Sequence, residues 1–229
     1  MPHVICSSCE RLVHQGSCSF STCRETYMCH KCSFAQRLGL SESALMEINA
    51  GSYLSDEHVN IASSMLKEQF GAKFHGLNPP LPVRHNNEIV NELQYPILIC
   101  GDKDYVQIMH TGNQHWVTCI FQTASPNTAI VPDSLRKTKL SSFLCLQVAM
   151  VACSKEESIT ICRKPCQQQR GSVDCALFAI AQATEFCSTS EIRFIDFDQS
   201  KLREHWMSCV RAGKLTRFPA ISSRPKKTL

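Results

Sequence analysis

Cys175 stands where a thiol could act as a nucleophile. Residues 168–174 form a polar loop, and residues 176–181 after it are apolar on every side, as in a helix buried at the centre of a domain. A thiol in the first turn of such a helix is held rigidly and lies at the positive end of the helix dipole, which favours the thiolate. We therefore identify Cys175 as the candidate nucleophile.

A nucleophilic thiol also needs a base, a group that orients the base, and a donor for the developing oxyanion. His115 begins a predicted strand and Asp133 follows a later one, so pairing within a sheet can bring the two side chains together. Gln169, on the loop before Cys175, can donate from its amide to an oxyanion. Taken singly, these residues also fit a core cysteine, a packed strand, a turn and a solvated loop. Their order along the chain is what favours a catalytic site.

The motifs His-Trp at 115–116, Asp-Ser at 133–134 and Gln-x4-Asp-Cys at 169–175 resemble the signature of the ubiquitin-like protein proteases. These are the SUMO-specific (sentrin-specific) and adenoviral-protease-like cysteine peptidases. The order His, Asp, Cys differs from that of papain-like enzymes, in which the cysteine comes first. The resemblance implies an α+β domain of the papain-like superfamily, with a small mixed sheet packed on helices.

The resemblance also implies an activity and a partner. Cys175 would attack the carbonyl after a Gly-Gly pair at the C-terminus of a ubiquitin-like, SUMO-like modifier or its conjugates, forming a thioester. His115 would relay the proton, Asp133 would orient His115, and Gln169 would support the oxyanion. No cofactor is expected for this chemistry.

Two positions depart from the family pattern. Ala176 replaces the glycine that usually follows the nucleophile, where a methyl group could crowd the first helical turn or the substrate channel. Gly171 stands one residue earlier than the usual glycine. These departures motivate a rival interpretation, a catalytically weak zinc-finger and ubiquitin-like binding module of transposon origin.

The N-terminal segment carries cysteines at metal-ligand spacing. Two Cys-x2-Cys pairs, formed by Cys6 with Cys9 and by Cys29 with Cys32, are separated by 19 residues. Two such knuckles can close on one tetrahedral ion, and the segment has too few aliphatic residues for a core of its own. We predict that these four residues bind one structural Zn²⁺, against the alternative of free or disulfide-bonded cysteines.

The inner spacing from Cys9 through His14 to Cys18 and the last Cys-x2-Cys pair resemble the second half of a PHD-type finger. A module of that kind implies a peptide or chromatin partner. The upstream half of the finger is absent, so a second zinc on His14 and Cys18 would need Cys23 or another histidine.

A change of composition near Ser41 predicts the domain boundary. Residues 1–40 form the expected zinc-binding module and residues 41–229 the expected protease domain, because Leu, Met and Ile recur at helical spacing from Ser41 onward. A helix is predicted from Ser55, as its N-cap, to about Gly71. On this helix His58 is expected to be a solvated residue.

Turn signals and apolar runs predict the remaining elements. The turn at 111–113 separates two strands and indicates a hairpin. The expected elements are strands at 106–109, 115–121, 128–131 and 158–163, helices at 142–152 and 198–210, and the helix that begins at Cys175.

Composition limits the class of partner and the compartment. A net charge of +4 and a pI near 8.3 make nucleic acid an unlikely partner. The sequence shows no apolar leader and no uninterrupted apolar run of about 18 residues, so we expect no membrane segment. With 15 cysteines, an odd number, a disulfide framework is not favoured, and we expect a reducing compartment, the nucleus or the cytoplasm.

Overall fold

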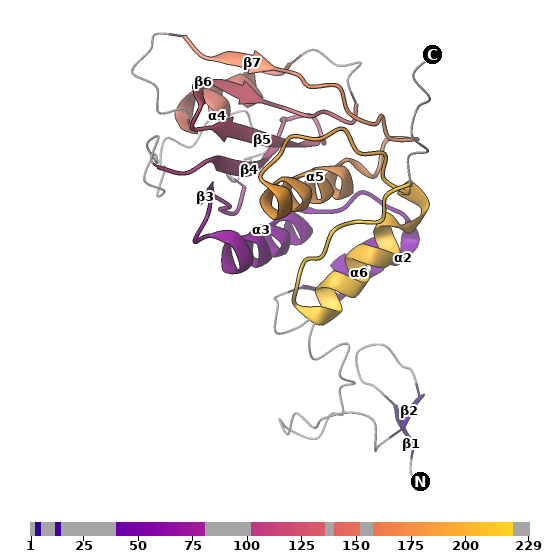
Figure 1. Cartoon of the computed structure of the whole chain (residues 1–229). Helices are drawn as coiled ribbons and strands as arrows, with labels where there is room; N and C mark the ends of the chain where they lie inside the picture. The colour runs from indigo at the N-terminus through magenta and orange to yellow at the C-terminus, as the bar shows by residue number, and fades with distance from the viewer. Residues whose placement is uncertain are drawn as a thin grey trace, which may run out of the picture.

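The computed structural model describes residues 3–5, 12–14, 40–80, 102–135, 140–151 and 158–221 (Figure 1). The zinc-ligand candidates Cys6, Cys9, Cys29 and Cys32 lie outside these residues. The helices are α2 (Glu42–Ala50), α3 (Asp56–Phe70), α4 (Ser142–Val151), α5 (Cys175–Thr189), the 3-10 helix η1 (Gln199–Lys201) and α6 (Leu202–Ala212). The strands are β1 (His3–Ile5), β2 (Leu12–His14), β3 (His75–Gly76), β4 (Tyr105–His110), β5 (Trp116–Gln122), β6 (Ser125–Ile130) and β7 (Thr160–Cys162).

Five strands form one mixed sheet in the order β3-β4-β5-β6-β7. β4, β5 and β6 are antiparallel neighbours, whereas the edge strands β3 and β7 pair parallel to β4 and β6. The predicted hairpin is confirmed, since His110 pairs with Trp116 across the turn. The small mixed sheet of the expected α+β class is likewise present.

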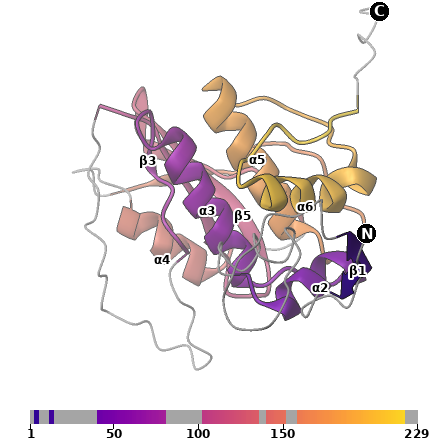
Figure 2. The same cartoon turned by 90° about the horizontal axis from the view of Figure 1, so that it is seen from below.

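Helices cover both faces of the sheet. Figures 1 and 2 show α3, α5 and α6 on one side and α4 on the other. Side chains of β5 alternate between the two faces: Ile120 packs into the cluster that includes α3, α5 and α6, while Val117 and Phe121 pack with Leu144 of α4. The period-two pattern therefore builds two cores, and the larger one surrounds α5.

α5 is buried along most of its length, as its apolar sequence indicates. Leu177 and Ile180 are fully buried, and each such side chain contributes about 1.5–3 kcal/mol through burial. The Thr118 hydroxyl of β5 donates to the carbonyl oxygen of Ala179 at 2.7 Å, which ties the helix directly to the sheet. α5 is thus fixed relative to β5.

α3 matches its prediction in extent but not in two details. Ser55 occupies the N-cap position, yet its side chain makes no capping hydrogen bond. His58, expected to be solvated, is completely buried. The Trp206 indole of α6 donates to His58 Nδ1 at 3.2 Å, and Glu47 of α2 lies 3.3 Å from His58 Nε2. His58 is buried because α6 covers this face of α3.

Near the N-terminus, β1 and β2 form a separate antiparallel pair in which Ile5 pairs with Leu12. In the sequence, Cys6 and Cys9 stand between these two strands. Across the described part of the chain, every helix is too short or too polar to cross a membrane.

Candidate active site

The sheet brings His115 and Asp133 together. His115 directly precedes β5 and Asp133 follows β6, and because these strands are antiparallel, the start of one lies beside the end of the other. His115 Nε2 lies 2.7 Å from Asp133 Oδ1. Both residues are buried, with 6% and 4% of their surface exposed. The contact expected from the order of the motifs is thus present.

The pKa values of His115 and Asp133 are shifted in opposite directions. Burial alone would lower the pKa of His115, but the hydrogen bond with Asp133 and the interaction with Cys175 outweigh it and raise that pKa to about 9. Burial alone would raise the pKa of Asp133, but hydrogen bonds from His115, the Leu135 backbone N–H and Arg163 lower it to about 2. An ionised carboxylate can only accept, so His115 Nε2–H donates.

The other ring nitrogen of His115, Nδ1, is not used by Asp133. Nδ1 is buried and has no hydrogen-bond partner of ordinary geometry among the described residues. Cys175 is nevertheless close enough to raise the pKa of the imidazole. The arrangement therefore has the order carboxylate, imidazole, thiol.

Cys175 is the first residue of α5 and is 1% exposed. Its Sγ lies 3.9 Å from the carbonyl oxygen of Gln114, the residue before His115. Gln114 has a left-handed backbone with φ of 51°, a conformation that costs a non-glycine residue about 1–3 kcal/mol. The chain bends sharply at Gln114, immediately beside the candidate nucleophile.

A charged network that the sequence did not reveal holds the start of α5. Asp174, next to Cys175, accepts from Arg203 Nη2 at 2.6 Å and from Gln199 Nε2 at 2.7 Å. The same guanidinium donates to the carbonyl oxygens of Glu47 and Ser52. Arg203 therefore anchors the start of α5 to α2 and α6.

Gln169 is hydrogen-bonded to Ser134, the residue after Asp133, and to Gly171. Its Oε1 accepts from the Ser134 hydroxyl at 2.8 Å, and its Nε2 donates to the carbonyl oxygen of Gly171 at 3.2 Å. The Gln169 backbone N–H donates to the carbonyl oxygen of Ser134 at 3.0 Å. An amide nitrogen carries two hydrogens, so the contact with Gly171 leaves one for an oxyanion.

Ala176 fits the first turn of α5. It is 1% exposed and belongs to the core around the helix. The turn closes normally, with the Phe178 N–H donating to the carbonyl oxygen of Asp174 at 3.1 Å. The methyl group thus does not prevent the helix from starting at Cys175.

A hollow of about 590 Å³, partly open to solvent, adjoins the pair. His115 and Asp133 form part of its wall, together with Ser172 and the half-exposed Tyr53. The remaining lining residues are Thr111, Asn113, Gln114, Leu135, Leu140, Ser141 and Leu144. An extended peptide segment could approach the imidazole through this opening.

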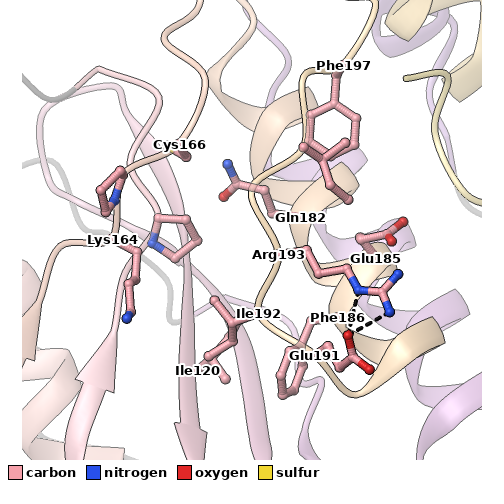
Figure 3. A pocket seen from close by; sticks show the side chains of 13 residues that line it. Ile120, Lys164, Cys166, Gln182, Glu185, Phe186, Glu191, Ile192, Arg193 and Phe197 are labelled. Atoms are coloured by element: carbon pink, nitrogen blue, oxygen red, sulfur yellow. Dashed lines mark hydrogen bonds and ion pairs between the residues drawn. The ribbon is translucent and has the colours of Figure 1, made fainter. Parts of the chain in front are cut away.

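A second hollow of about 460 Å³ lies between the sheet and α5 (Figure 3). Lys164 and Cys166 line one side, and Arg193, paired with Glu191 at 2.6 Å, lies across from them. No histidine lines it, whereas His115 lines the first hollow.

Two other thiols, those of Cys119 and Cys187, are buried in the core. Burial raises the pKa of Cys119 and of Cys187 to about 12. Both therefore stay protonated at neutral pH and behave as small core residues. Within the described ranges, no cluster of His, Cys, Asp or Glu side chains suits a metal ion.

Comparison with known proteins identifies the fold. No protein-family description matches the sequence. No curated protein matches it either. Among solved structures, "SUMO protease Ulp1 with the catalytic cysteine oxidized to a sulfinic acid" aligns with a TM-score of 0.52 and 12% identity, over 80% of this chain and 94% of that one.

The sulfenic acid form of the same protease aligns with a TM-score of 0.52 and 11% identity, over 84% of this chain and 98% of that one. At such low identity the likeness shows that the two backbones follow a similar path, and it gives no evidence about the reaction. The protein shares the fold of the SUMO protease Ulp1.

Proposed function

We propose that this chain is a cysteine-type peptidase that cleaves a ubiquitin-like modifier of the SUMO class, or a related Gly-Gly site, by thioester acyl transfer. The observation that carries the proposal is the buried pair formed by His115 and Asp133, whose Nε2 and Oδ1 atoms lie 2.7 Å apart. The thiol of Cys175 accompanies this pair, at the start of α5. The Ulp1-like fold adds support.

In the first half of the reaction, Cys175 Sγ attacks the carbonyl carbon of the scissile bond as a thiolate. The C–N bond then breaks, and His115 gives the proton on Nδ1 to the leaving amine. Asp133 keeps the imidazolium oriented through Nε2. The Cys175 backbone N–H and Gln169 Nε2 are the proposed donors to the oxyanion.

In the second half, a water molecule attacks the thioester. His115 Nδ1 takes its proton, the C–S bond breaks, and the electron pair returns to Sγ, which restores the resting thiolate and imidazolium. Each half-reaction uses the same nitrogen, once as acid and once as base, so no further titrating group is needed.

Electrophile probes built on ubiquitin-like proteins with a reactive Gly-Gly terminus test the proposal. A SUMO-class probe should label the full chain, Cys175→Ala should abolish the labelling, and Cys166→Ala should leave it intact, because Cys166 lines the other hollow. Labelling that survives Cys175→Ala would disprove the nucleophile. Tight binding of the modifier without any adduct would favour the rival binding module, and labelling by ubiquitin probes alone would replace the SUMO class.

We also propose that Cys6, Cys9, Cys29 and Cys32 hold one structural Zn²⁺ in residues 1–40. Their spacing supports this, as does the pairing of β1 with β2 on either side of the first Cys-x2-Cys pair. Metal analysis should find about one zinc per chain, lost when Cys6 and Cys32 are both replaced by Ser. A metal-free native protein would contradict the zinc site.

We propose that residues 1–40 also contact a peptide or chromatin partner. A pull-down of histone peptides by the intact chain would test this.

A further inference from the structure

Arg163 holds the oxygen of Asp133 that His115 does not use. Its Nη2 donates to Asp133 Oδ2 at 2.5 Å. Asp133 Oδ1 accepts from His115 and, at 2.8 Å, from the Leu135 backbone N–H. Both oxygens of a carboxylate that is 4% exposed are therefore held by donors on separate segments.

The position of Arg163 follows from the sheet. β7 pairs parallel to β6, so the ends of both strands point the same way, and Arg163 follows β7 as Asp133 follows β6. Backbone hydrogen bonds continue past the strands: the Val131 N–H donates to the carbonyl oxygen of Cys162 at 2.9 Å, and the Lys164 N–H to that of Val131 at 3.2 Å. These bonds flank Arg163 and fix its backbone. Only 20% of its side chain is exposed.

We propose that Arg163 is a positioning residue of the active site, which fixes the rotation of the Asp133 carboxylate and, through it, the orientation of the His115 ring; this inference rests on the proposed function. A carboxylate held at one oxygen can turn about its Cβ–Cγ bond and move Oδ1 out of line with Nε2. A guanidinium at the other oxygen prevents that turn, because a charge-assisted hydrogen bond is both strong and directional.

The charges around the pair give the inference a measurable consequence. Among the described residues, the titratable and charged groups that interact with the pair are Arg163 after β7, Cys175 of α5 and His110 of β4. The pKa of His110 is lowered by burial and by the charge of His115. Arg163 is one of the causes that keep the pKa of Asp133 low. Without it, the carboxylate is less ordered and supports the imidazolium less well, so the pKa of His115 should fall.

The test compares Arg163→Gln, Arg163→Lys and the control Lys164→Gln, whose side chain lines the other hollow. With a SUMO-class fluorogenic reporter, Arg163→Gln should lower kcat/KM by about tenfold to a hundredfold, the range for one hydrogen bond to a charged group. The loss should fall on kcat, and the alkaline limb of the pH profile should move to lower pH. Arg163→Lys, which keeps the charge, should recover part of both effects, and Lys164→Gln should resemble the unmodified protein.

Alkylation of Cys175 by iodoacetamide, followed by mass spectrometry of its peptide, needs no substrate. Arg163→Gln should slow it at neutral pH, because a less stable imidazolium supports less thiolate. If no reporter is cleaved by the unmodified chain, slowed alkylation still supports the role of Arg163 while the proposed function fails. Unchanged alkylation with an unchanged alkaline limb overturns the inference. Equal losses in the Gln and Lys variants with the alkaline limb in place would also overturn it, by showing a merely structural role.

Discussion

Replacing Asp133 by Asn tests the electrostatics of the site most directly. The pKa of His115 rises from an ordinary value of 6.5 to about 9, and one pKa unit corresponds to about 1.4 kcal/mol, so the surroundings favour the imidazolium by about 3 kcal/mol. Burial by itself would lower this pKa, so the contributions of Asp133 and Cys175 together exceed the net preference. Removing the carboxylate charge should therefore cost most of that preference, about 2–3 kcal/mol, or roughly 30-fold to 160-fold in rate.

The geometry explains why Asn cannot substitute for the carboxylate. With its oxygen placed to accept from His115 and Leu135, the amide NH2 would face the Arg163 guanidinium, one donor against another. Turning the amide over would instead present a donor to His115 Nε2–H. Either arrangement leaves a donor unpaired in a buried site, in addition to the lost charge.

The assay is kcat/KM for a SUMO-class reporter between about pH 6 and about pH 10. Because the pKa of His115 is raised, the imidazolium persists below about pH 9 and is lost as the pH rises through that value. The unmodified protein should therefore lose activity near pH 9, and Asp133→Asn should move that loss toward pH 6.5. Asp196→Asn, at an exposed carboxylate outside the site, is the matched control. An Asp133→Asn profile with its alkaline limb still near pH 9 would refute the reasoning.

Further predictions concern the oxyanion donor and the buried histidine. Gln169→Ala should lower kcat by about a hundredfold with little effect on KM, whereas Ser134→Ala, which only frees the Gln169 oxygen, should cost less than tenfold in steady-state kinetics. Trp206→Phe should lower the free energy of unfolding by about 2–4 kcal/mol in urea titrations, because it leaves His58 Nδ1 without its donor and opens a cavity. Burial lowers the pKa of His58, so the unfolded state takes up its proton first and stability should fall as the pH drops below about 6.5. His58→Gln should flatten that dependence; an equally steep fall would contradict it.

Local signals in the sequence were sufficient for the elements that carry the site. A polar loop followed by an all-apolar run placed the start of α5 at Cys175, where the structure has it. The turn at 111–113 likewise gave the β4–β5 hairpin. Such features depend on residues that are close together in the chain, so a short stretch of sequence is enough to predict them.

Contacts between distant segments were not predictable in the same way. Arg163 is one basic residue after a strand, and its pairing with Asp133 depends on β7 lying parallel to β6, which no local pattern specifies. The bond between Arg203 and Asp174 likewise joins α6 to the start of α5. His58 lies on a helix that looked half-solvated, and Trp206, 148 residues later in the chain, packs against it and donates to its ring.

The site is best understood as a row of alternating charges at one edge of the fold. Arg163, Asp133 and His115 follow or precede three neighbouring strands, and Cys175 begins the helix packed beside them. In the proposed resting state the row reads positive, negative, positive, negative, so each buried charge has an opposite neighbour. Burial makes an uncompensated charge costly, whereas a compensated row is tolerated. In the proposed mechanism the whole row holds the proton on His115, and the covalent bond from Cys175 to the substrate removes the negative charge at one end of the row. That loss would weaken the hold on the His115 proton at the step in which the leaving amine needs it.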